Sequence, residues 1–205
     1  DKTQGIVPEG AKKCEWINQN KTQMKCELNP LVKWSDGVPV KSEDYVRAFV
    51  YLIKPETKAR EISHLMRLKN AKKILQKKAK PETLGVRALN DFTLQLEFDE
   101  KDPDFIPKLT SAVLIPWRSI PNIKKPKELL TNGPYRIKDF SPRKANLLRN
   151  EHYPYGNPAR PEVEIFYVEE LSTGLNLFDL GKINFLPHFY LVFFYNLYLL
   201  FLVMS

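Results

Sequence analysis

The sequence contains few of the residues that build metal and catalytic sites. It has two cysteines and three histidines among 205 residues, and they lack the ligand spacing of a metal site. His64, His152 and His188 lie far apart in the chain, and neither a cysteine–histidine arrangement nor a nucleophile elbow is present. The sequence therefore predicts no metal, no cofactor and no enzyme activity.

Glycine is also scarce. The eight glycines form no phosphate-binding loop, and the sixteen prolines predict many fixed turns and extended connections. Internal repeats are absent. The hydrophobic content of 43% and the charged content of 27% are typical of a soluble globular protein. The length is sufficient for one or two domains with a sizeable core.

A net charge of +8 suggests an anionic partner. However, the 32 basic residues are spread among 24 acidic ones, and the densest cluster, Lys69 to Lys80, has the spacing of a solvated helix face. No nucleic-acid-binding motif accompanies it, so the sequence predicts no nucleic-acid partner. Nucleic-acid binding remains a less favoured hypothesis, and it predicts that binding weakens steeply as the salt concentration rises.

Charged residues are missing from residues 185–205, which are almost all aromatic or aliphatic. At about 1.5 Å per residue, a helix of this length spans a hydrocarbon core of about 30 Å. Lys and Arg are absent from its far side, and Pro187 and His188 lie near its start. We expect an apolar tail over 187–205 that is either an out-of-frame or truncated end or a membrane anchor. Both alternatives expose apolar surface and favour membrane association or aggregation.

The stretch from Leu31 to Ile53 predicts the end of a strand, a tight turn and an amphipathic helix. Asp36-Gly37 is a turn signal, and Ser42 is the expected helix N-cap. Apolar residues then recur at helical spacing and predict one face turned toward a core; they are Val46, Phe49, Val50 and Ile53.

Two β-hairpins are predicted, over residues 11–28 and 86–98. In the first, a turn at 18–21 places Cys14 opposite Cys26, where a disulfide is geometrically allowed. Two reduced, partly buried thiols are the alternative, and the sequence leaves both open.

Further strands are predicted over 112–115, 135–140, 145–149 and 163–168, and helices over 71–80, from Phe105, and over 169–180. In the last helix Leu171, Leu175 and Phe178 share one face. The expected fold class is α/β in the sense of mixed α+β, with a mixed sheet, β-hairpins and flanking helices.

Four ordered segments of this sequence resemble one family. They are Trp34-Ser35-Asp36-Gly37 with Pro39 and Asp44, the hairpin 84–93, the turn and strand 131–137, and Leu148-Arg149-Asn150-Glu151-His152-Tyr153, followed by a similar stretch over 175–184. Together they are similar to the bacterial extracellular solute-binding proteins of the oligopeptide/dipeptide/nickel group. These proteins are the ligand-capturing subunits of ATP-binding-cassette importers.

The resemblance implies a non-catalytic protein that binds a peptide or other small solute and delivers it to permease subunits. It implies a periplasmic protein or an outer-face lipoprotein, although residues 1–10 show no signal-peptide pattern. Residues 1–186 would form a partial periplasmic-binding-protein-like lobe, the N-terminal half of the family fold in a truncated form that binds peptide weakly or not at all. The alternative is a membrane-associated interaction protein anchored by the apolar tail.

The resemblance also suggests site residues. The family signature, expected to be structural, comprises Trp34, Ser35, Asp36, Gly37, Pro39, Asp44, Asn132, Gly133 and Tyr135. Positional candidates for ligand contact follow the first helix, with a solvated loop as the alternative; they are Arg60, Glu61, Ser63 and His64.

Overall fold

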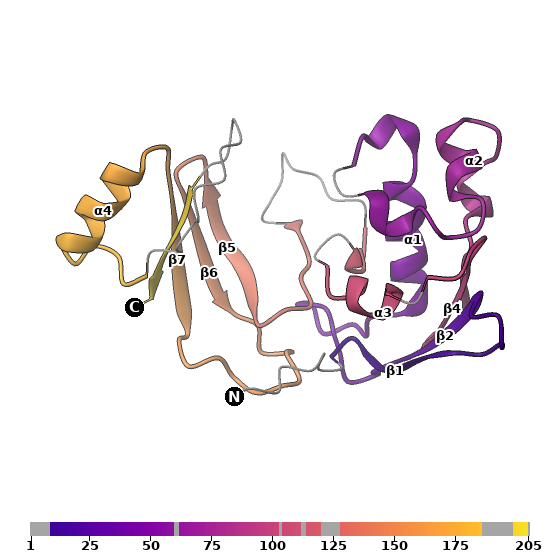
Figure 1. Cartoon of the computed structure of the whole chain (residues 1–205). Coiled ribbons are helices and arrows are strands. Elements are labelled where there is room, and N and C mark those ends of the chain that lie inside the picture. The colour runs from indigo at the N-terminus through magenta and orange to yellow at the C-terminus, as the bar shows by residue number, and fades with distance from the viewer. Residues whose placement is uncertain are drawn as a thin grey trace. The chain divides into compact units, whose positions relative to one another are not determined.

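The computed structural model describes residues 9–59, 62–102, 104–111, 114–119, 128–185 and 199–204. The chain divides into two compact units, which Figure 1 draws with their helices and strands. Unit 1 comprises Asp1–Lys33 and Val38–Pro121, and unit 2 comprises Trp34–Gly37 and Asn122–Ser205.

Unit 1 is built on a four-stranded antiparallel sheet in the order β1-β2-β4-β3. Its strands are β1 (Ala11–Trp16), β2 (Gln23–Leu28), β3 (Val86–Asn90) and β4 (Thr93–Glu97). Both predicted hairpins are therefore confirmed. The first turn is held by Asn18, whose Oδ1 accepts the Thr22 amide at 2.9 Å while its Nδ2 donates to Thr22 Oγ1 at 2.8 Å. Cys14 pairs with Cys26 across β1 and β2, and the structure joins them in a disulfide.

Helix α1 (Ser42–Leu52) covers one face of this sheet (Figure 1). The expected cap is wrong, because Lys41 is the N-cap and Ser42 is already helical. The Asp44 carboxylate accepts the Lys41 backbone amide at 3.0 Å and so caps the first turn of α1. The Ser42 hydroxyl is buried and donates instead to the carbonyl of Asn90.

The core of unit 1 lies between α1 and the sheet. Phe49 and Ile53 are fully buried, whereas Val46 and Val50 are only partly buried. Alternate residues of the strands complete this core and include Met24, Cys26, Leu94 and Leu96. The predicted core-facing stripe of α1 is thus confirmed for Phe49 and Ile53.

The shorter elements of unit 1 are α2 (Ala71–Leu75), α3 (Phe105–Lys108) and three 3-10 turns, η1 (Pro55–Thr57), η2 (Ile62–Leu65) and η3 (Pro81–Thr83). The helix predicted over 71–80 ends early because Lys77 has a left-handed backbone, with φ of 59°. Residues 112 and 113 lie outside the described part of the chain. The Leu114 amide donates to Ser111 O at 3.0 Å in a turn, so the described remainder of the strand predicted over 112–115 is not a strand.

Unit 2 contains a second four-stranded antiparallel sheet, in the order β5-β6-β7-β8. Its strands are β5 (Tyr135–Ser141), β6 (Lys144–Arg149), β7 (Glu162–Val168) and β8 (Leu199–Met204), and helix α4 (Leu171–Asp179) follows β7. The three strands and the helix predicted for this region are confirmed. Leu171, Leu175 and Phe178 of α4 are about half exposed, at 47%, 45% and 45%.

The expected mixture of α and β structure is confirmed, with one correction. All described strands pair antiparallel, so neither sheet is mixed. Hairpins join β1 to β2, β3 to β4 and β5 to β6, and such short connections produce antiparallel neighbours. Of the apolar tail, the structure describes residues 199–204, which form β8. No helix within the described ranges has the length and apolar character needed to cross a membrane.

Candidate functional site

The turn Trp34–Gly37 is the first component of the candidate site in unit 2. Its backbone closes through the Gly37 amide, which donates to Trp34 O at 2.8 Å, and the Trp34 side chain is buried. Gly37 has φ of +83°, a conformation that L residues rarely adopt. A Cβ at this position would also lie 3.1 Å from His152 Cε1. Glycine is therefore required here by both backbone conformation and close packing.

The second component is the turn that leads into β5. The Ser35 amide donates to Thr131 O at 2.7 Å, and the Thr131 amide donates to Ser35 Oγ at 3.3 Å. The Thr131 hydroxyl in turn donates to Tyr135 O at 2.8 Å. These bonds join the Trp34–Gly37 turn to the start of β5, although the two segments are about a hundred residues apart in sequence.

The third component is Asn150, which follows β6 and is 1% exposed. Its amide donates to Pro134 O at 2.8 Å, and its side-chain Nδ2 donates to Gly133 O at 2.8 Å. Its Oδ1 accepts the His152 amide at 3.1 Å. One buried side chain therefore holds the turn before β5 and the turn after β6 in a fixed arrangement.

These three components surround a hollow of about 410 Å³, lined by Ser35, Leu129, Leu130, Arg136, Ile137, Asn150, Glu151 and His152. All of these residues belong to unit 2. The lining offers a guanidinium, a carboxylate, a hydroxyl and an imidazole, which suits hydrogen bonding to a polar solute. In the described ranges, no group of three or more His, Cys, Asp or Glu residues is placed to hold a metal ion.

The structure brings most of the predicted signature together. Seven of its residues lie in the turns of unit 2 described above: Trp34, Ser35, Asp36, Gly37, Asn132, Gly133 and Tyr135. The other two lie in unit 1. Pro39 bridges to Lys33, and Asp44 accepts from Arg47 at 2.8 Å while closing the start of α1.

Of the four candidates for ligand contact, Ser63 and His64 are not in the lining of the hollow. Arg60 and Glu61 lie outside the described residues. Ser63 and His64 lie in η2 of unit 1, where Ser63 is exposed and His64 is partly buried. Their role in ligand contact stays a prediction.

Sequence reasoning did not single out Arg136, Asn150, Glu151 or His152 as site residues. Asn150, Glu151 and His152 were visible only as part of a motif, and nothing local showed that they meet the Trp34–Gly37 turn. The usable signal was the position of Asn150 directly after a strand, where a side-chain amide often holds a turn.

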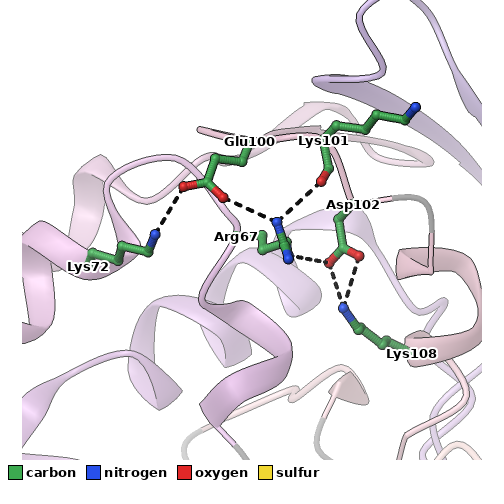
Figure 2. A network of polar contacts seen from close by, with 6 residues as sticks. All are labelled: Arg67, Lys72, Glu100, Lys101, Asp102 and Lys108. Carbon is green, nitrogen blue, oxygen red and sulfur yellow. Dashed lines mark hydrogen bonds and ion pairs between the residues drawn. The ribbon is translucent and has the colours of Figure 1, made fainter.

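A second polar cluster lies in unit 1 and links α2 and α3 to the segment after β4. Figure 2 shows Glu100 between Lys72 and Arg67, at 3.1 Å and 3.2 Å, and Asp102 beside Lys108, at 2.7 Å. The hydrogen bond from Lys72 lowers the pKa of Glu100 below its ordinary value. Nearby, a hydrogen bond from Lys69 lowers the pKa of Glu97. Each carboxylate has a cationic partner, so the cluster is best explained as structural.

Comparison with known proteins gives one consistent family. The family model described as bacterial extracellular solute-binding proteins, family 5 Middle, matches residues 5–198. A putative binding protein of Haemophilus influenzae is 30% identical over 149 residues, covering 72% of this chain and 28% of that protein. The periplasmic oligopeptide-binding protein OppA of Escherichia coli is 27% identical over 179 residues, covering 82% and 33%.

The solved structure of the Escherichia coli murein tripeptide binding protein MppA has the same fold. It superposes with a TM-score of 0.77 at 26% identity, covering 87% of this chain and 36% of that one. The chain thus spans about a third of the length of these relatives. The match to the family model extends over most of the sequence, and the chain belongs to the bacterial extracellular solute-binding proteins, family 5.

Proposed function

We propose that this chain is part of the ligand-capturing component of an ATP-binding-cassette importer whose solute is a peptide. The observation that carries the proposal is the family match over residues 5–198, together with relatives named for oligopeptide and murein tripeptide binding. Capture would be noncovalent. An extended peptide pairs its backbone with strand edges while lobes close over it, and the closed form delivers the peptide to the permease.

The proposed location is the periplasm or the outer face of the membrane, where the protein would be free or lipid-anchored. Relatives such as OppA are named as periplasmic proteins. The Cys14–Cys26 disulfide supports this location, because disulfides persist mainly in oxidising compartments.

Residues 1–186 would contribute part of one lobe, and other parts of the family fold would supply the opposing lobe. The hollow of unit 2 would present hydrogen-bonding groups of both charges, from Arg136 and Glu151. Arg60, Glu61, Ser63 and His64 are kept as proposed ligand contacts. Because a lobe that cannot close buries little of a peptide, we expect this chain alone to bind short peptides weakly or not at all.

A chimera tests the proposal directly. The segment of Escherichia coli OppA that matches this chain is replaced by residues 5–185 of this chain, and peptide binding is measured by titration calorimetry. We expect the Kd for short peptides to stay within about tenfold of that of OppA, a change of about 1.4 kcal/mol. A chimera with a cooperative thermal transition that binds no peptide would contradict the proposal.

The same chimera tests the four proposed contacts. Changing Arg60, Glu61, Ser63 and His64 to alanine is expected to weaken peptide binding by roughly tenfold or more. The matched control changes Glu56 and Lys58, which are exposed residues of the same connection, and is expected to leave the Kd unchanged. If the two variants change the Kd equally, the four residues are not specific ligand contacts.

A further inference from the structure

The segment Arg67–Lys80 of unit 1 has the highest density of positive charge in the chain and contains no acidic residue. Its basic side chains fall into two groups. Arg67, Lys69 and Lys72 form ion pairs with carboxylates. The others, which we call the lysine surface, are exposed and form no ion pair with any described residue; they are Lys73, Lys77, Lys78 and Lys80.

The lysine surface is held on a firmly packed support. Ala71 and Ile74 of α2 are buried at 0% and 1% exposure and belong to the core. Beyond the helix, the Lys77 amide donates to Ile74 O and the Lys78 amide donates to Lys73 O, both at 2.8 Å. Lys73 therefore lies in α2, and Lys77 and Lys78 lie in the hydrogen-bonded turn that follows it, so binding a partner need not order this backbone first.

Most nearby carboxylates are paired with cations, as Figure 2 shows for two of them, and Asp99 accepts the Asn70 amide at 3.1 Å. Glu100 is held by Arg67 and Lys72, and Asp102 is held by Lys108. Glu97 is held by Lys69 at 2.9 Å. Glu82 follows the segment in sequence and forms no ion pair with a described residue, so it offsets only part of the charge of the lysine surface.

We propose that the lysine surface docks on the anionic headgroups of a phospholipid membrane. The cations are all lysines. A lysine ammonium attracts many phosphates as a point charge, whereas it does not bind a single phosphate in the fixed two-bond geometry of an arginine. The segment Arg67–Lys80 also contains no aromatic residue on which a nucleobase could stack, which disfavours single-stranded nucleic acid. The choice of a membrane rests on the proposed function, since a receptor that serves a permease works beside a lipid surface.

The test is vesicle binding by the full chain. Partition is measured by sedimentation with phosphatidylcholine vesicles and with vesicles containing about 30% phosphatidylglycerol, because the difference isolates the electrostatic part from any apolar association. The variant K73Q/K77Q/K78Q/K80Q is expected to lose at least about twentyfold in partition to the anionic vesicles, because each lysine near such a surface contributes roughly fivefold and two of the four account for that loss. Raising the salt to about 0.5 M is expected to weaken the wild-type chain strongly and the variant little.

The matched control is K12Q/K21Q/K33Q/K58Q, which removes the same charge from exposed positions of unit 1 outside the segment. It is expected to retain partition within about threefold of the wild-type chain. Equal loss in both variants, equal binding to both kinds of vesicle, or salt-sensitive binding to an oligonucleotide without binding to vesicles would each overturn the proposal. The assay contains no peptide, so its failure leaves the proposed peptide binding unaffected.

Discussion

The two units differ in how well they bury their apolar residues. Unit 1 contains the continuous core between α1 and its sheet. Among the residues of unit 2 whose burial the structure describes, the buried apolar side chains are Trp34, Ala145, Val163 and Ile183. Unit 2 also exposes large apolar side chains, including Leu171, Leu175, Phe178 and Leu180. In the described part of unit 2, hydrogen bonds join the turn Trp34–Gly37 to the start of β5.

The difference in apolar burial predicts a difference in stability between the two units. Apolar burial is the main favourable term in folding, and the core of unit 1 provides more of it than the described part of unit 2 does. In unit 2 the turns before β5 and after β6 are joined by hydrogen bonds, each of which contributes only about 1 kcal/mol to the free energy of unfolding. Opening of unit 2 should therefore require less free energy than opening of unit 1.

The largest expected effect is that of removing an aromatic ring from each unit. Phe49→Ala in unit 1 empties a fully buried site and should lower the free energy of unfolding by about 3–5 kcal/mol. Phe178→Ala in unit 2 removes a ring that is 45% exposed and should cost less than about 1 kcal/mol. Urea unfolding followed by circular dichroism measures both, and equal costs would refute the contrast between the units.

Removal of the disulfide should have the next largest effect. The double variant C14S/C26S opens a loop of sequence separation 12 in unit 1 and should cost about 3 kcal/mol. The stability of unit 2 should not change, because both cysteines belong to unit 1. Thermal unfolding with and without reductant measures the change, and a wild-type chain that is insensitive to reductant would argue against the disulfide.

A smaller effect is expected for Asn150→Ala, which removes the side chain that joins the two turns of unit 2. The Gly133 carbonyl and the His152 amide then lose a partner, and we expect a loss of about 2 kcal/mol. Asn132→Ala, in the adjacent turn, provides the comparison, because Asn132 is only partly buried and should cost less. Similar costs for both variants would mean that Asn150 does not hold the junction.

The smallest effect concerns acid stability. Because Lys69 lowers the pKa of Glu97 in the folded state, the charged carboxylate stabilises the protein above its ordinary pKa of 4.5. This contribution, less than about 1 kcal/mol, is lost as the pH falls through the lowered pKa. Glu97→Gln should therefore reduce the decline in stability in acid, measured by urea unfolding across this pH range. An unchanged decline, as expected for the exposed control Glu82→Gln, would contradict the assignment.

Much of the local structure could be predicted from sequence because its causes are local. Alternation of apolar and polar residues around short turns was sufficient for the hairpins that contain Cys14–Cys26 and Leu94–Leu96. The end of α2 could not be predicted, since it depends on Lys77 adopting a left-handed backbone that the lysine itself does not favour. The cap of α1 was misjudged because the Asp44 carboxylate accepts the Lys41 amide, while the Ser42 hydroxyl donates to the carbonyl of Asn90, which is distant in sequence.

The candidate site was predictable only in its parts. The turns at Trp34–Gly37 and Thr131–Tyr135 were recognisable as motifs, but their hydrogen bonds through Ser35 join segments that are distant in sequence. Sequence spacing carries no information about such contacts. The hollow that Ser35 helps to line, and the place of Arg136 and His152 in it, therefore emerged only from the structure.

Hydrogen exchange followed by mass spectrometry tests the contrast between the units most directly, because it reports on each segment of the intact chain separately. Amides of β2, β4 and α1 should exchange only when the whole chain unfolds. Amides of β5, β6 and β7 should exchange earlier, while the amides of unit 1 are still protected. Equal protection of both sheets, or stronger protection of β5–β7, would contradict the account.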